Sequence, residues 1–404
     1  MRYGLNASRT RAVRRVSGPV AAFVLVATSA LAQRREAGVS TPEPVRIVQL
    51  GALTREQAAL HRGLQLGFGF VATRRRQLGI EGSVRPLEFT AIDDRGDLAK
   101  TRELLEQRLG DKRCDLIVGS PLERLRDPKV AKLLRDHSVL VFEPDAWTSS
   151  ADRRAPSTMR APIETLVEAL TKRLVGDGCE RLGIVLPHGE SSLRETASKV
   201  FERQGVHPVA WISMDASGDG KLEARGMQKL RPDAVLLLCD ATHALRFARR
   251  FDALRGDAIV RYAMTADVGA QALVQALGDA ADGSYVASSF PWPWLDALPI
   301  ANDYRTAIEA QKASVTDLQE SRVFEGFALA LLLERVVDRE IGGLDVATQL
   351  EPTLAGHEPV LDLDGLRMAW PKRRPHGGLR AYLSVVLRGK LEFSPADDEA
   401  SPSK

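Results

Sequence analysis

The stretch VLVFEPDAWTSSADRR, residues 139–154, begins as an apolar run and then becomes polar within a few residues. Residues 143–150 present two acids, an indole and three hydroxyls, among them Glu143, Asp145, Trp147 and Thr148. Carboxylates accept hydrogen bonds or hold cations, hydroxyls both donate and accept, and an indole offers a large flat apolar surface. A buried strand with this ending indicates either an ordinary exit into a loop or a surface presented to a ligand.

Polar residues also follow other apolar runs of the chain. His188 follows RLGIVLP, Asp240 follows AVLLLC, and Asp267 comes two residues after AIVRYAMT. If these runs are parallel strands, their carboxyl ends share one edge of a sheet, and ligands bind beyond that edge. His188 is the only one of the seven histidines that this pattern places well for a cleft. A helix cap at Asp240 and a surface position for His188 remain open as alternatives.

Motifs of known catalytic and metal sites are incomplete. Residues 189–193, GESSL, lack the second glycine of a nucleophile elbow, and residues 217–221, SGDGK, lack the first glycine of a phosphate loop. No Cys-x-x-Cys or His-x-x-x-His spacing accompanies the cysteines. We therefore expect no enzyme, no cofactor and no metal site.

The elements that must position these residues alternate between strand and helix from Val45 onward. Short apolar runs separated by amphipathic segments of ten or more residues predict a doubly wound parallel sheet, and the pattern restarts near residue 164. A helical return and a β-rich end follow the second set. The fold class is α/β, with two similar parallel-sheet lobes whose facing edges would form a cleft.

The N-terminal segment is predicted to be a secretory signal peptide rather than part of the fold. A basic start is followed by the apolar run PVAAFVLVATSALA, which ends in Ala30-Leu31-Ala32 before Gln33. Removal of residues 1–32 takes away five arginines and no acid, so the formal net charge changes from +3 to −2. Nucleic-acid binding therefore has no electrostatic support. No cysteine stands directly after the apolar run, so we expect no lipid anchor at a new N-terminal cysteine.

Three cysteines remain, Cys114, Cys179 and Cys239. Cys179 precedes an apolar run and Cys239 follows one, so a parallel sheet puts them at opposite edges, too far apart for a disulfide. We predict three reduced, partly buried thiols.

The order of these segments resembles the type I periplasmic binding proteins, specifically the Leu/Ile/Val-type substrate-binding proteins of ABC transporters. VRIVQLGALT is similar to the first strand of that family, and IDDRGDLAKTRELLEQRL to its acidic strand end and following helix. The motifs DLIVGS, VLVFEPDA, LRPDAVLLLCD and FEGFALALLLERV follow in the expected order. Each motif is weak alone, and their collinearity over residues 44–393 supports the resemblance.

The resemblance implies a hinged receptor with three crossings between the lobes. Residues 44–157 and 289–340 would form the N-terminal lobe, residues 158–288 and 341–393 the C-terminal lobe, and residues 394–404 a disordered tail. Such receptors close around a small molecule and pass it to the membrane permease of an ABC importer. We expect a monomer in the periplasm that binds an amino acid or a related amine or amide.

The resemblance also points to ligand-binding residues, although the match is incomplete there. Hydroxyls and backbone amides after the third and fourth strands hold the ligand in the family, and an acidic or aromatic group comes from the second lobe. The corresponding residues here are Ser120, Asp145, Ala146, Trp147, Thr148, His188, Asp240 and Asp267. Their excess of acid suggests a solute with a cationic or donor-rich group, since a buried carboxylate needs a partner.

Departures from the family pattern keep other functions open. Arg124, near Ser120, is expected to pair with Glu123 or with an anionic ligand, and Ser120 itself could serve only the backbone of a turn. A ligand sensor on the same fold, or a scaffold that has lost ligand binding, are the alternatives to a transport receptor.

Overall fold

The computed structural model describes residues 43–53, 58–79, 85–144, 149, 152, 156–215, 218–311, 317–338, 361–370, 376–378 and 380–393. The predicted signal peptide and the predicted disordered tail lie outside the described residues. None of the helices in the described part combines the length and apolar character that a membrane span requires.

The first sheet has four parallel strands in the order β2-β1-β3-β4. They are β1 (Val45–Gly51), β2 (Leu87–Asp93), β3 (Leu116–Ile117) and β4 (Leu140–Val141). Val45 and Ile47 of β1 face one hydrophobic core, whereas Val48 and Leu50 face another. Because both faces of a parallel strand are covered, β1 is apolar on both sides.

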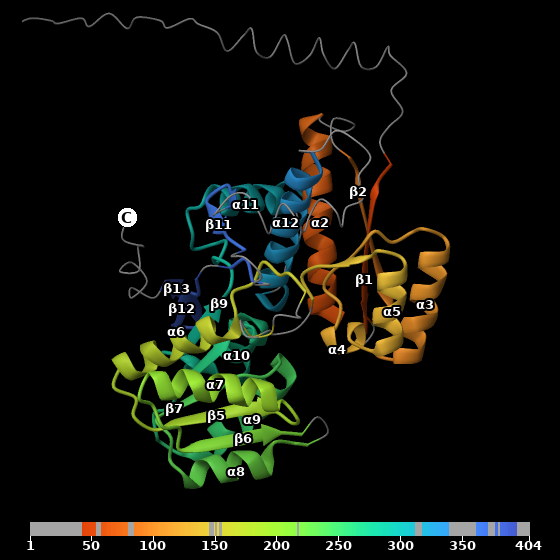
Figure 1. The fold of residues 1–404 in the computed structure, drawn as a ribbon. Coiled ribbons are helices and arrows are strands. Elements are labelled where there is room, and N and C mark those ends of the chain that lie inside the picture. The colour runs from red at the N-terminus through yellow and green to blue at the C-terminus, as the bar shows by residue number, and fades with distance from the viewer. Residues whose placement is uncertain are drawn as a thin grey trace, which may run out of the picture. The chain divides into compact units, whose positions relative to one another are not determined.

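Helices cover both faces of this sheet, and together they form the N-lobe (Figure 1). One face packs against α2 (Ala58–Leu78), α11 (Pro299–Gln311) and α12 (Asp317–Asp338). The other packs against α3 (Leu98–Gly110), α4 (Leu122–Leu125) and α5 (Pro128–Asp136). Asp97 caps α3, because its side chain accepts a hydrogen bond from Ala99 N at 2.7 Å.

The helices α2 and α12 pack closely through glycines. A Cβ atom at Gly67 would collide with the backbone of Val323 and Phe327, and one at Gly326 would collide with the backbone of Leu64. Only glycine allows this approach of the two helices. The contact holds α12, which enters the N-lobe from the distal part of the chain, against the first helix of the fold.

The second sheet has seven strands in the order β13-β12-β9-β8-β7-β5-β6. They are β5 (Leu182–Pro187), β6 (Ala210–Met214), β7 (Ala234–Leu237), β8 (Arg261–Thr265), β9 (Tyr285–Ser288), β12 (Tyr382–Leu387) and β13 (Lys390–Phe393). Strands β5 to β9 pair in parallel, whereas β12 pairs antiparallel with both β9 and β13. The predicted second α/β lobe, here the C-lobe, and its β-rich end are confirmed.

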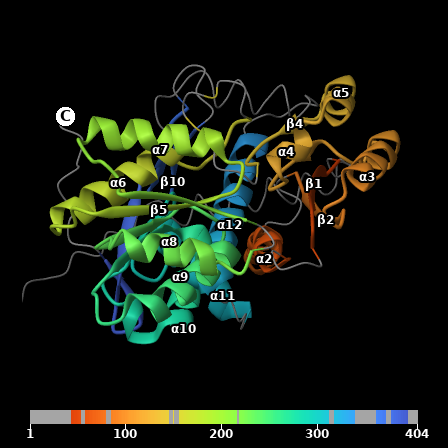
Figure 2. The ribbon, with the colours of Figure 1, turned by 90° about the horizontal axis from the view of Figure 1, so that it is seen from below.

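Helices also cover both faces of the second sheet (Figure 2). On one face lie α6 (Ile163–Gly176) and α7 (Ser191–Arg203). On the other lie α8 (Lys221–Lys229), α9 (Ala241–Arg255), α10 (Ala270–Leu277) and the short 3-10 turns η1 (Ala266–Val268) and η2 (Gly278–Ala281). The three cysteines are free, as predicted, and they are buried rather than partly buried.

Segments that cross between the sheets meet at backbone bridges. Phe142 pairs with Ser157, and Thr158 pairs with His376. The predicted division of the chain into lobes stays a prediction. One segment that was assigned to the C-terminal lobe, the hairpin of β10 (Leu361–Leu363) and β11 (Leu366–Met368), packs in the same hydrophobic core as α2 and α12.

Candidate ligand-binding site

Ser120 lies in the N-lobe, just beyond β3, and its hydroxyl bonds to the backbone. Leu50 N donates to Ser120 Oγ at 2.9 Å, and the hydroxyl donates to Val118 O at 3.2 Å. Ser120 is buried and ties the end of β1 to the loop after β3. The open alternative of a turn-stabilising serine describes these contacts, and ligand binding by Ser120 stays a prediction.

The four residues Asp145, Ala146, Trp147 and Thr148 lie outside the described residues. Their predicted role in binding is therefore retained as a prediction. Arg124, which was expected to pair with Glu123 or with an anionic ligand, forms an ion pair with the buried Asp94. Because Asp94 follows β2 and Arg124 lies in α4, after β3, this pair joins the segments that follow the two strands on either side of β1.

In the C-lobe, His188, Asp240 and Asp267 follow the parallel strands β5, β7 and β8, so they share the carboxyl edge of the sheet. His188 is exposed. Asp240 caps α9 by accepting a hydrogen bond from His243 N at 3.1 Å, and it also contacts His243 Nδ1. The helix-cap alternative for Asp240 is confirmed.

Asp267 lies in η1, where the C-lobe meets α12. Its Oδ1 is 3.8 Å from Arg322 Nε, and its side chain is 25% exposed. Among the predicted binding residues of the C-lobe, Asp267 is thus the one that contacts a charged side chain of the N-lobe.

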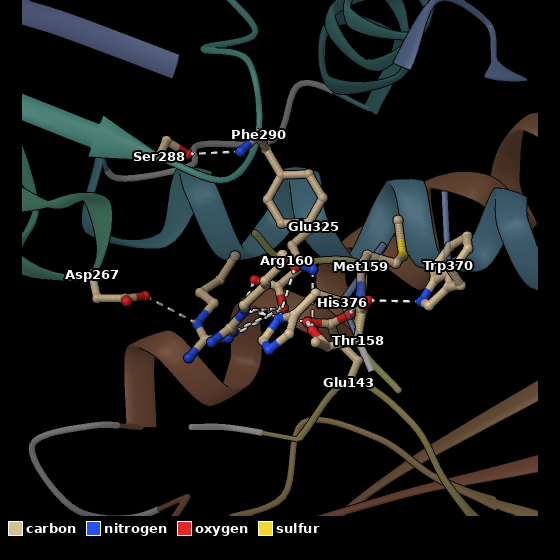
Figure 3. A network of polar contacts seen from close by, with 11 residues as sticks. Glu143, Thr158, Met159, Arg160, Asp267, Ser288, Phe290, Glu325, Trp370 and His376 are labelled. Atoms are coloured by element: carbon tan, nitrogen blue, oxygen red, sulfur yellow. Dashed lines mark hydrogen bonds and ion pairs between the residues drawn. The ribbon is translucent and has the colours of Figure 1, made fainter. Parts of the chain in front are cut away.

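Behind Asp267 lies a row of alternating acidic and basic side chains, which we call the hinge charge network (Figure 3). Its members are Glu143, Arg160, Glu325, Arg322 and Asp267. Arg160 NH2 lies 2.8 Å from Glu325 Oε1, and Arg322 NH1 lies 3.2 Å from Glu325 Oε2. Glu325 therefore has a guanidinium group on each side, and the row links the segment after β4, α12 and the C-lobe turn η1.

Glu143 forms the inner end of the network and is completely buried. Its carboxylate accepts hydrogen bonds from Thr158 Oγ1 at 2.6 Å and from Met159 N, and Arg160 Nε lies 3.2 Å away. Burial and the nearby Glu325 raise the pKa of Glu143 to about 8, against the opposing effect of Arg160. The residue also has a φ of 48°, a left-handed conformation that a non-glycine residue seldom adopts.

Aromatic residues enclose the inner end of the network. Trp370 Nε1 donates to Thr158 O at 3.0 Å, and Phe142 packs near the Trp370 ring. His376 is buried, its Nδ1 lies 3.3 Å from Arg160 O, and burial lowers the pKa of its imidazole. These aromatic side chains reduce the access of water to the network and strengthen the electrostatic interactions within it.

A small cavity of about 30 Å³ adjoins the network. Its polar lining consists of Arg160, Thr265, Asp267, Ser288, Ser289, Ser321 and Glu325. Ser321 and Glu325 come from α12 of the N-lobe, whereas Thr265 and Asp267 come from the C-lobe. A group in this cavity would contact both lobes at once.

Among these lining residues, Asp267 is the one that was predicted from the sequence. The sequence around Arg160 has no pattern that would mark it as a site residue. Glu325 does have such a pattern, because it is a single acid within the apolar helical run RVFEGFALALLL. An acid among buried residues needs a cationic partner, and this rule could have marked it.

A comparison with models of protein families agrees with the observed fold. Residues 27–378 match the family model described as "Periplasmic binding protein". The chain belongs to the periplasmic binding protein family. This is a family of non-enzymatic ligand receptors, so the expectation of a non-catalytic protein is confirmed. A comparison with curated proteins found no significant match.

Solved structures of periplasmic binding proteins share the fold at low sequence identity. A substrate-binding periplasmic protein from Ralstonia solanacearum is 18% identical, with a TM-score of 0.73 over 87% of this chain and 100% of that chain. A possible leucine/isoleucine/valine-binding protein from Rhodopirellula baltica is 17% identical, with a TM-score of 0.71 over 88% and 97%. An ABC transporter solute-binding protein from R. palustris, in complex with 4-hydroxybenzoate, is 16% identical, with a TM-score of 0.70 over 87% and 96%.

Proposed function

We propose that the chain is a periplasmic solute receptor that closes around one small molecule and delivers it to the permease of an ABC importer. The observation that carries this proposal is the polar cavity lined from both lobes, by Thr265 and Asp267 on one side and Ser321 and Glu325 on the other. A solute that contacts both lobes binds the closed form better than the open form, and it therefore shifts the population toward closure.

The charges of the site bear on the class of solute. The sequence predicts an amino acid or a related amine or amide, because acids follow several strands. Those of the acids that the structure describes have partners within the protein: Asp267 faces Arg322, Asp240 caps α9, and Glu143 accepts from Thr158 and Met159. A cationic solute is therefore not required to balance them.

This internal pairing favours a second class of solute, hydroxylated aromatic acids. The R. palustris relative in complex with 4-hydroxybenzoate binds a member of that class. A hydroxyl or carboxyl oxygen can bond with the serine and threonine hydroxyls that line the cavity. We keep amino acids and amines as the first class and hydroxylated aromatic acids as the second, to be separated by experiment.

The localisation and partner follow from the proposed role. The basic and apolar segment over residues 1–32 would direct export and then be removed, leaving a monomer without a lipid anchor. Contact with the permease would be transient, as delivery requires release.

A thermal-shift screen tests the proposal. The mature chain, from Gln33, is heated with amino acids, amines, dicarboxylates and hydroxylated benzoates in separate wells. A solute at a hundred times its dissociation constant stabilises the folded state by about 2.7 kcal/mol. A rise in melting temperature with one chemical class supports the receptor and selects the class. No rise with any class would favour the scaffold alternative.

A further inference from the structure

Two hydroxyl groups at the cavity form no hydrogen bond in the described part of the chain, those of Thr265 and Ser321. Thr265 ends β8 and is only 1% exposed, and Ser321 lies in α12. Both residues line the cavity. Buried hydroxyls in native proteins nearly always have a partner, so two unpaired ones beside the same cavity indicate a missing hydrogen-bonding group.

The cavity has room for such a group. About 30 Å³ is available, and a water molecule needs about 10–15 Å³. A hydroxyl group or a water molecule therefore fits. The group would sit between a residue of the C-lobe and a residue of the N-lobe.

The charges around the cavity select its chemistry. Glu325 already has guanidinium partners in Arg160 and Arg322, and Asp267 also faces Arg322. An ammonium group would compete with these guanidinium groups, and a carboxylate would face two carboxylates. A neutral group that both donates and accepts, a hydroxyl, satisfies the two side-chain hydroxyls without disturbing the ion pairs.

We propose that this cavity is a binding site for one hydroxyl group, which bridges Thr265 Oγ1 of the C-lobe and Ser321 Oγ of the N-lobe. The hydroxyl comes from a water molecule or from the bound solute; the second source rests on the proposed function. In either case the occupant joins the two lobes beside the hinge charge network, and Thr265 and Ser321 act as positioning residues. With a solute hydroxyl, they also determine specificity.

The first arm of the test is a crystal structure of the mature protein without added solute, at a resolution that shows ordered water. We expect one ordered oxygen within hydrogen-bond distance of both hydroxyls. It should be lost in Thr265→Val, which keeps the shape of the side chain. Thr171→Val is the matched control, because Thr171 is equally buried but donates to Val167 O in its own helix. This arm needs no solute, so it stands even if the proposed transport function fails.

The second arm identifies the source by titration calorimetry with 4-hydroxybenzoate and benzoate, which differ by one hydroxyl. If the solute supplies the group, 4-hydroxybenzoate binds about 3- to 10-fold more tightly, the effect of one neutral hydrogen bond. That preference should disappear in Thr265→Val and Ser321→Ala and persist in Thr171→Val. Equal affinities, or no binding of either probe, assign the site to water when the first arm shows the ordered oxygen. The proposal is overturned if neither solute-free nor probe-soaked crystals place an oxygen on both hydroxyls.

Discussion

Arg160 and Glu325 form a buried ion pair across 165 residues of sequence, with Arg160 NH2 at 2.8 Å and 3.0 Å from the two carboxylate oxygens. Arg160 belongs to the segment between β4 and α6, and Glu325 belongs to α12. The pair therefore fixes a segment that crosses between the sheets to the helix that contacts η1. Two hydrogen bonds from one guanidinium set the orientation as well as the distance.

Removal of the arginine should destabilise the fold strongly. In Arg160→Met the carboxylates of Glu143 and Glu325 lose their shared partner while they remain buried. Loss of one partner of a buried ion pair costs about 3–5 kcal/mol, so urea unfolding should show a decrease of that size in the free energy of unfolding.

The control for that variant is an exposed pair. Lys199 and Glu195 lie 2.6 Å apart on the surface of α7, with both side chains well exposed. Lys199→Ala should leave the free energy of unfolding almost unchanged, because exposed ion pairs contribute little to stability. Equal effects of the two variants would contradict the assignment of a structural role to the hinge charge network.

The stability of the protein should fall as the pH rises from about 4.5 to about 8, in part through Glu143. Its pKa is raised from 4.5 to about 8 in the folded state because it is buried and lies near Glu325. The folded form retains a proton in this range that the unfolded form has lost, so the folded state loses stability as the pH increases. Urea unfolding over that range should show the slope.

Glu143→Gln isolates this contribution, because Gln keeps an acceptor for Thr158 and cannot ionise. The variant should be less sensitive to pH than the wild type between 4.5 and 8. Burial lowers the pKa of His376, which acts in the opposite direction by removing stability as the pH falls below 6.5. His376 is unchanged in the variant, so the difference between the two curves reports Glu143. If stability changed with pH in the same way in the variant and in the wild type, the raised pKa of Glu143 would be refuted.

The glycines between α2 and α12 provide a test of the packing. Gly67→Ala should destabilise the fold by about 1–3 kcal/mol, because the added methyl group collides with the backbone of Val323 and Phe327. Gly69 lies on the same helix, and a Cβ there meets nothing within 4 Å. Gly69→Ala should therefore stabilise the helix by up to about 1 kcal/mol. Thermal unfolding of both variants measures the contrast, and effects of equal sign would count against the close approach.

The three thiols should react with a thiol reagent only after unfolding. Cys114 is buried, and burial raises the pKa of its thiol to about 12, while Cys239 is completely buried. Because the thiolate is the reactive form, the native protein should react slowly at neutral pH. In denaturant all three should react. Fast reaction of the native protein would show that the cores around these residues open readily.

The elements themselves could be predicted because their signals are local. An acidic strand end followed by a helix was expected over residues 92–109, and the structure has β2 and α3 there. The strand at Val45–Gly51 is apolar on both faces, as a central parallel strand must be. These features depend on periodicity and on neighbours a few residues away, which the sequence displays directly.

The site could be predicted only in part. Strand ends placed Asp267 at the sheet edge, since topology follows from the alternation of elements. Its partner Arg322 and the link from Arg160 to Glu325 depend on contacts between residues far apart in the chain, which no local pattern encodes. The position of the hairpin β10–β11 against the N-lobe core was missed for the same reason.

The most direct test of the central claim is an equilibrium titration of the mature protein by calorimetry with the compounds that give the largest thermal shift. The proposed receptor function predicts one solute bound per chain and a negative heat-capacity change from burial of apolar surface. If no solute class bound to protein that circular dichroism shows to be folded, the proposed receptor function would be contradicted.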